Sequence, residues 1–227
     1  MSITLAELKL QSRQLADREN SQFVTDTELT AYINSAIAEL QDLLISAYSS
    51  DYYISDYTFS TVANQTTYAL PADFYKLRGV DCALINNEYA SLRPFNFNER
   101  NRNDSFSSWG LMTGPSIRYR LLGDNIVFSP APDGIYSIKL WYIPTAVKLV
   151  ADSDVLTDLN QYSDFVIYDA AIKMLIKEES DPSALMRERE NCSRRIVEMA
   201  QNRDAGQPES VSDIYAENND YYWYRGS

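Results

Sequence analysis

Side chains that commonly perform catalysis are scarce in this sequence. Its 227 residues contain no histidine, the side chain that most often serves as general base or metal ligand near neutral pH. A serine or cysteine nucleophile needs a neighbouring base to take its proton. The two cysteines lie at predicted apolar positions, Cys82 in a strand and Cys192 on a helix stripe, and are interpreted as core residues. The sequence therefore predicts no catalytic residue and a protein that is not an enzyme.

The sequence also contains no motif that indicates a metal or cofactor site. The nearest approach is the segment Asp152-Ser153-Asp154 with Asp158, which lacks the central glycine and the closing glutamate of a calcium-binding loop. A solvated linker is the favoured interpretation of this segment. The glycines stand singly, and none belongs to a phosphate-binding loop. We therefore expect no metal and no cofactor.

The charge of the chain limits its partners. There are 32 acidic residues against 20 basic ones, a net charge of −12, which opposes binding to nucleic acid through its phosphates. The excess lies in residues 1–57, with nine acids and three bases, and in residues 146–227, with sixteen and nine. Residues 58–145, with seven and eight, are nearly neutral. DNA close to this protein is expected to be repelled rather than held.

No stretch of the sequence reaches the length of about 18 apolar residues that a membrane span needs. The first ten residues lack the basic and then apolar pattern of a secretory signal. We therefore expect no membrane partner and synthesis in a reducing cell interior.

Three groups of residues are candidates for contacts rather than for chemistry. Asp169 shares a helix face with apolar residues, and a buried acid must be paired or protonated, so we expect a structural contact with an arginine or a helix end. Basic residues in the middle of the chain are either ordinary surface charge or a contact with an acidic neighbouring subunit; they are Arg93, Arg100, Arg102, Arg118 and Arg120. Aromatic residues in the polar C-terminal stretch are expected to fill pockets of a partner protein rather than fold back on their own domain; they are Tyr215, Tyr221, Tyr222, Trp223 and Tyr224.

Hydrophobic spacing predicts helices at both ends of the chain. Apolar residues recur every three or four positions from Leu29, behind a capping box of Thr25 and Glu28, and predict a helix over 26–49. Further helices are predicted over 3–18, 162–179 and 182–203.

Between the helices the hydrophobic period shifts towards two, which is typical of β-strands. We predict three hairpins and a last strand, in the order 57–62 with 67–70, 80–85 with 89–92, 117–122 with 126–129, and 135–143. The middle of the chain is therefore expected to be a small, mostly antiparallel β domain.

The predicted fold class is α+β. Neither terminal helix pair can bury its apolar stripe alone, so the two pairs are expected to form a four-helix bundle core. A central antiparallel β insertion would project from this core, and an extended C-terminal tail would follow it. The predicted parts are 1–56 for the N-terminal helices, 57–145 for the β domain, 146–206 for the C-terminal helices and 207–227 for a partner-docking tail.

A series of short motifs runs along the chain in a specific order. They are Thr25-Asp26-Thr27-Glu28-Leu29 with Tyr32-Ile33-Asn34, Tyr68-Ala69-Leu70-Pro71-Ala72-Asp73-Phe74, Arg118-Tyr119-Arg120, Gly123-Asp124-Asn125, the turn 130–134, Leu140-Trp141-Tyr142-Ile143-Pro144, Asp169-Ala170-Ala171-Ile172-Lys173 and Lys177-Glu178-Glu179-Ser180-Asp181. In this order the chain resembles the head–tail adaptor (connector or head-completion) proteins of bacteriophages over about residues 1–213. The stretch after Ile214 lies outside the resemblance.

The resemblance implies a structural protein of the virion neck, between capsid and tail, that is made in the cytoplasm of the host bacterium. Such adaptors form a ring of about a dozen copies between the portal and a tail or tail-tube protein, and their C-terminal segments often insert into the portal. Genomic DNA passes the ring without specific binding. We therefore expect acids of the helical parts to face the lumen and repel phosphate, and the aromatic tail to dock on the portal.

Two other classes of protein remain as alternatives. A tail-associated binding module, such as a tail-completion or receptor-contact protein, would expose the β section at the tip of the particle. A tail-borne cell-wall hydrolase would need a pair of carboxylates in a cleft, and nothing in the sequence singles out such a pair.

Overall fold

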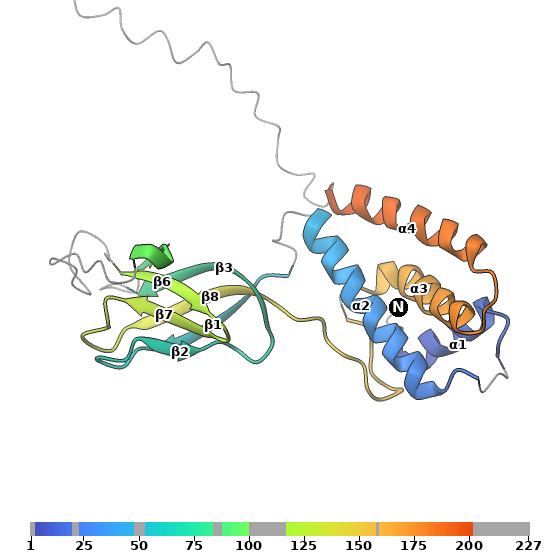
Figure 1. Cartoon of the computed structure of the whole chain (residues 1–227), viewed down its shortest axis with the longest axis horizontal. Helices are drawn as coiled ribbons and strands as arrows, with labels where there is room; N and C mark the ends of the chain where they lie inside the picture. Colours follow the sequence, from blue (N-terminus) through green and yellow to red (C-terminus); the bar gives the residue numbers. More distant parts are fainter. Residues whose placement is uncertain are drawn as a thin grey trace, which may run out of the picture.

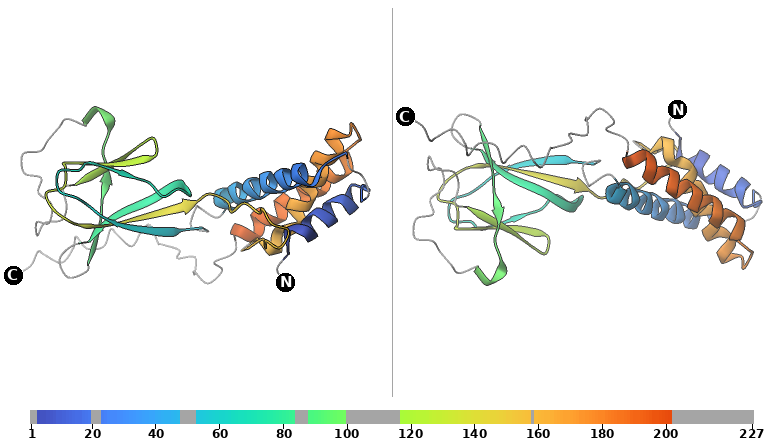
Figure 2. Two further views of the ribbon diagram at one scale, coloured as in Figure 1. Left: turned by 90° about the horizontal axis from the view of Figure 1, so that it is seen from below. Right: turned by 90° about the horizontal axis from the view of Figure 1, so that it is seen from above.

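The chain folds into a helical part and a β part that lie end to end (Figures 1 and 2). The computed structural model describes residues 3–19, 23–47, 53–83, 88–99, 117–157 and 159–201. Within these ranges the helices are α1 (Leu5–Leu15), α2 (Asp26–Ala47), α3 (Ser163–Lys177) and α4 (Ser183–Gln201). None of the helices in the described ranges is long and apolar enough to cross a membrane.

The α3 helix is the centre of the helical part. It packs against α1, α2 and α4, and its buried residues lie on several of its faces. A helix that is apolar over most of its circumference is expected to be surrounded in this way. The other three helices bury one stripe each against it.

The start of α2 confirms the predicted capping box. The Glu28 backbone N–H donates to Thr25 Oγ1 over 3.3 Å, and the Thr25 N–H donates to the Glu28 carboxylate over 3.0 Å. The same pair of bonds joins Thr4 and Glu7 at the start of α1. Both boxes satisfy N–H groups that a helix start leaves without an intrahelical partner.

The β part contains two four-stranded sheets. One sheet has the order β1-β8-β3-β4, from β1 (Ser55–Ser60), β8 (Ser137–Pro144), β3 (Phe74–Ala83) and β4 (Tyr89–Ser91). The other has the order β2-β7-β6-β5, from β2 (Thr67–Ala69), β7 (Asn125–Ser129), β6 (Arg118–Leu122) and β5 (Arg93–Pro94). We call these the β8 sheet and the β6 sheet.

The two sheets pack face to face around a hydrophobic core of their own. Val80, Ile138 and Leu140 of the β8 sheet share this core with Ile126 and Phe128 of the β6 sheet. The helical part has a separate core. The chain therefore buries apolar surface in two places rather than one.

The prediction of a four-helix bundle as the core of the fold is wrong. The described part of the chain is a mixed α+β fold in which two four-stranded sheets, not a minor insertion, form much of the structure. The error arises because strand pairing joins segments far apart in the sequence. The β1 strand pairs with β8 and the β2 strand with β7, so the predicted hairpin of 57–62 with 67–70 does not exist.

The other two predicted hairpins are confirmed. The β3 and β4 strands pair with Asp81 opposite Ser91, and β6 pairs with β7 with Leu122 opposite Asn125. Gly123 in the second turn has φ +58°, which a glycine adopts without strain. The short β5–β6 pair is parallel, which the sequence did not indicate.

The segment between β8 and α3 belongs to the helical part. Leu149, Leu156 and Leu159 lie in the helical core, and the Asn34 amide exchanges hydrogen bonds of 2.9 and 2.8 Å with the backbone of Leu149. Thr4 forms an isolated bridge to Val155. The segment is therefore folded onto α1 and α2 rather than solvated along its length.

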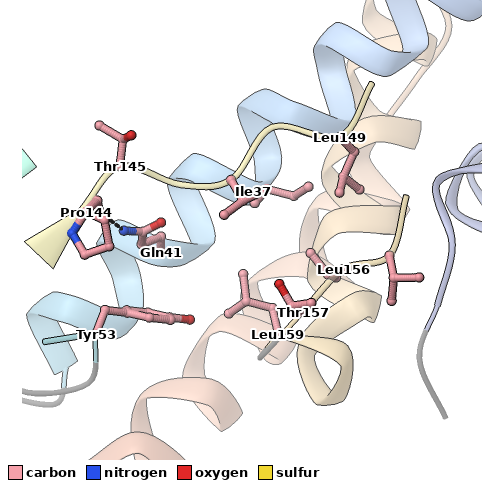
Figure 3. Close-up of a pocket in the computed structure, with 11 residues that line it drawn as sticks. Ile37, Gln41, Tyr53, Pro144, Thr145, Leu149, Leu156, Thr157 and Leu159 are labelled. Carbon is pink, nitrogen blue, oxygen red and sulfur yellow. Dashed lines mark hydrogen bonds between the residues drawn. The ribbon is translucent and has the colours of Figure 1, made fainter. Parts of the chain in front are cut away.

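The two parts meet at a narrow junction near the second half of α2. Gln41 is buried, and its Nε2 donates to the carbonyl of Pro144 over 2.8 Å; the Tyr75 hydroxyl donates to Asp42 over 2.7 Å. A cavity of about 130 Å³ lies beside this junction, with Tyr53 on one side of it (Figure 3). These contacts connect the end of β8 to the helical core.

Candidate interaction surfaces

The acids of α2 stabilise the helical part itself. This helix carries four acids and no base. Asp26 lies 2.8 Å from Arg13, Glu28 lies 2.7 Å from Lys177, Glu39 pairs with Arg189, and Asp42 accepts from Tyr75. These contacts tie α2 to α1, α3, α4 and β3.

The pKa of Glu28 is lowered to about 2, first by the hydrogen bond from Lys177 and then by that from the Thr25 backbone. A carboxyl whose pKa is lower in the folded state stabilises the fold above its ordinary pKa of 4.5, and this contribution disappears as the pH falls towards 2. We expect Glu28→Gln to lower the melting temperature at neutral pH. Between pH 4.5 and pH 2, the melting temperature of this variant should fall less steeply than that of the wild type. Circular dichroism across the pH range measures both effects.

Glu7→Gln is the matched control, because Glu7 fills the same capping-box position in α1 and its described bonds are to Thr4. We expect Glu7→Gln to change the fall of the melting temperature at acid pH less than Glu28→Gln does. If the melting temperatures of the wild type and of Glu28→Gln fall equally steeply at acid pH, the Lys177 contact does not stabilise the fold.

Asp169 lies at the centre of a network that joins three helices. Its side chain is 6% exposed, with Oδ1 2.9 Å from Arg189 Nε and Oδ2 2.6 Å from Lys173 Nζ. Lys173 also donates to Ser35 Oγ over 3.0 Å. The Arg189 guanidinium lies 4.9 Å from the ring centre of Phe165. The structure thus places this buried acid between an arginine of α4 and a lysine of its own helix.

The acids considered as a calcium loop have structural roles. Asp152 pairs with Lys9 over 2.6 Å, and Asp154 accepts from the backbone N–H groups of Val150 and Ala151, both over 2.8 Å. The two N–H groups lower the pKa of Asp154. Asp158 lies outside the described residues. Across the ranges that the structure describes, no three potential ligands among His, Cys, Asp and Glu gather as a metal site would require.

Both cysteines are buried. Burial raises the pKa of the Cys82 thiol to about 11 and also raises that of Cys192. A thiol must ionise to act as a nucleophile, so these environments disfavour reactivity.

The arginines of the β part gather on the outer face of the β6 sheet. Arg93 and Arg118 lie side by side in the parallel β5–β6 pair, and both are exposed. Arg120 follows on the same face of β6; it donates to the Phe95 carbonyl over 3.2 Å and lies 5.6 Å from the Phe97 ring centre. Arg100 and Arg102, the other two of the predicted group, lie outside the described residues.

A second polar cluster, which sequence reasoning missed, lies on the outer face of the β8 sheet. Trp141 Nε1 donates to Asp81 Oδ2 over 2.6 Å, and Lys139 Nζ lies 4.2 Å above the Trp141 ring. Lys139 also lies 3.3 Å from Asp56. The alternation in β8 of buried Ile138 and Leu140 with polar or aromatic neighbours was the signal that could have placed this cluster on one face.

The predicted aromatic docking residues, Tyr215, Tyr221, Tyr222, Trp223 and Tyr224, all lie outside the described residues. The last described residue is Gln201, at the end of α4.

Among the described residues, the two thiols are buried and most acids considered above are bonded within the chain, so the geometry assigns them structural roles. Comparison with known proteins identifies the class: a structural adaptor protein of bacteriophages. Residues 3–212 match the SU10 adaptor protein family, a family of phage head–tail adaptors, and the chain belongs to this family. Membership of this family confirms the resemblance of the sequence to phage head–tail adaptors and suggests a non-enzymatic role. No curated protein matches the sequence.

Proposed function

We propose that the protein is the head-to-tail adaptor of a virion neck, where copies form a ring between the portal and the tail. The observation that carries this proposal is the family match over residues 3–212. A closed ring of about a dozen copies is a cyclic homo-oligomer, in which every copy makes the same two contacts with its neighbours. The portal binds on one side of the ring and a tail or tail-tube protein on the other.

The arrangement of the two parts supports a role in connecting other proteins. The helical and β parts lie end to end, so one copy presents different surfaces at its two ends (Figure 2). Ion pairs stiffen the helical end, including the 2.5 Å pair of Arg18, in the segment that follows α1, with Glu178, the residue that follows α3. A rigid, elongated subunit can hold a portal and a tail at a fixed separation.

The charge of the chain supports passage of DNA without retention. A net charge of −12 repels phosphates, and this repulsion acts over about 8 Å at physiological salt, so it is confined to the lining of a channel. The four acids of α2 make contacts within the chain. We therefore assign the lumenal repulsion mainly to other acids of the helical part.

The aromatic residues of the C-terminal tail are proposed to dock on the portal. The tail follows α4, whose end lies near the junction of the two parts (Figure 1). Residues 202–227, if extended, reach roughly 80 Å at about 3.3 Å per residue, far enough to leave the subunit's own body. Buried Tyr and Trp side chains provide much of the binding energy at protein interfaces.

We expect replacement of Tyr221, Tyr222, Trp223 and Tyr224 by alanine to weaken binding to the portal protein of the same phage at least 100-fold. Losing even two contacts of about 2 kcal/mol each exceeds this factor. The matched control in the same segment is Asn218→Ala with Asn219→Ala, which should bind as the wild type does. Pull-down and interferometry measure the affinities, and native mass spectrometry of wild-type complexes measures the ring. Unchanged portal binding by the aromatic variant, or neck complexes containing single copies, would contradict the proposal.

A further inference from the structure

We infer that the junction between the helical part and the β part is a latched hinge. Two hydrogen bonds, from Gln41 to Pro144 and from Tyr75 to Asp42, hold the parts at one angle, and we call them the latch. When the latch is released, the parts swing about residues 146–148. The inference goes beyond the proposed function, because it concerns the shape of a single copy. In the proposed ring, a closed latch would give every copy the same shape, as identical contacts require.

The two parts share little packing with each other. Among the described elements, helices pack mainly on helices and strands on strands, and the two hydrophobic cores have no residue in common. The parts meet only near the second half of α2 and lie end to end (Figure 2). Parts of a chain that are not joined by a large apolar interface are expected to move relative to each other. Other contacts must therefore fix the angle between them.

The segment after β8 is fastened to one part before residues 146–148 and to the other part after them. The Thr145 N–H donates to the Asp73 carbonyl over 2.7 Å, which ties the start of the segment to the β part. Asn34 exchanges two hydrogen bonds with the backbone of Leu149, which ties the end of the segment to α2. No described residue forms a hydrogen bond with residues 146–148. Hinges are typically a few positions of this kind, at the end of an element, that absorb a change of backbone angles.

The cavity beside the latch leaves room for this segment to move. It has a volume of about 130 Å³, with Gln41 of α2 and Thr145 of the segment among the residues that line it (Figure 3). Val147 also lines the cavity and is 69% exposed, so core packing does not hold its side chain. Atoms at the edge of a void lack contacts on one side. The segment can therefore shift here without displacing a packed core.

The latch joins two neighbouring residues of α2 to two neighbouring strands of the β part. Gln41 is buried, so loss of its bond to Pro144 would leave a polar group without a partner away from water. Asp42 accepts from the Tyr75 hydroxyl of β3, and this bond is the first cause that raises the pKa of Tyr75. A hydrogen bond to a carboxylate is stronger than one between neutral groups. Two such bonds side by side fix an angle, whereas either bond alone would still allow the parts to turn about it.

Double electron–electron resonance between spin labels on the two parts tests the inference in the full chain. The labels are attached at Thr58→Cys in β1 and Glu190→Cys in α4, which are exposed positions, whereas both native thiols are buried and react slowly. We expect one narrow distance distribution with the latch intact. Gln41→Ala with Tyr75→Phe should widen the distribution about twofold or more. Tyr75→Phe alone alters an exposed side chain and should give an intermediate width, even if the double variant does not fold.

The matched control is Gln65→Ala with Tyr136→Phe. It removes an amide bond to a backbone carbonyl and a tyrosine bond to an aspartate, both within the β part, and should leave the distribution unchanged. Narrow distributions in the latch variants, or a broad one with the latch intact, would overturn the inference. Faster hydrogen exchange within 118–144 or 163–201 of the latch variants would also overturn it, because the widening would then report unfolding. These measurements involve neither ring nor portal, so their failure leaves the proposed function intact.

Discussion

Asp169→Ala is expected to destabilise the helical part by about 3–5 kcal/mol, because it leaves buried cationic groups without their counter-charge. Arg189 and Lys173 contact the two carboxylate oxygens, and their side chains are 28% and 27% exposed. Since both cations retain some access to water, we expect a value in the lower half of that range. The effect extends beyond α3 because the same arginine also contacts Glu39 of α2.

Urea unfolding followed by circular dichroism at a helical wavelength measures this cost. Asp164→Ala is the matched control: Asp164 lies on the same helix and pairs with Arg195 over 3.4 Å, but both side chains are more than half exposed. An exposed pair of this kind contributes below about 1 kcal/mol. The double variant Asp169→Leu with Arg189→Met should recover much of the loss, because an apolar pair can replace a buried ion pair at little cost. If Asp169→Ala unfolds within about 1 kcal/mol of the control, the network does not hold the helices together.

The helices could be predicted because their signals are local. The capping box at Thr25 and Glu28 and the apolar spacing behind it lie within one segment, and α2 begins where they predict. The prediction for Asp169 used the same local information: its periodicity places it on an apolar face, where a bare carboxylate cannot remain. Identifying Arg189 as its partner required the packing of α4 on α3.

The sheets could not be assembled from the sequence because their pairing is long-range. Strand β1 lies against β8, with Phe59 opposite Ile138, and no turn signal links two segments that far apart. Two strands separated by Asn64-Gln65 satisfied the local pattern of a hairpin, although they belong to different sheets. Because the strands form two sheets that pack face to face, they bury a second hydrophobic core. The four helices therefore do not form the core of the whole fold.

The candidate contact residues also depended partly on local sequence signals and partly on long-range strand pairing. Alternation along β6 was enough to place Arg118 and Arg120 on one face. The position of Arg93 beside Arg118 depends on a parallel pair of strands that the sequence did not indicate. Likewise, the bond from Trp141 to Asp81 connects residues in different strands, so the polar cluster on the outer face of the β8 sheet emerged only from the fold.

Phe128→Ala is expected to destabilise the β part by about 3–5 kcal/mol, the usual cost of removing a buried phenyl ring from a core. Phe128 is 1% exposed and lies between the sheets, with ring centres 5.7 Å from Tyr68 and 6.4 Å from Phe59. Because the helical core is separate, we expect the loss to remain in the β part. Hydrogen exchange measured by mass spectrometry should show lost protection in peptides from 118–144 and retained protection in 163–201.

Phe165→Ala is the mirror control, since Phe165 is equally buried in the helical core and should give the opposite pattern. Loss of protection throughout both regions in either variant would mean that the two parts unfold as one cooperative unit. The functional consequence follows from where the portal is proposed to bind, which is the tail that follows α4 and not the β part. Phe128→Ala should therefore retain portal binding, and loss of portal binding would show that the tail docks only when the β part is folded.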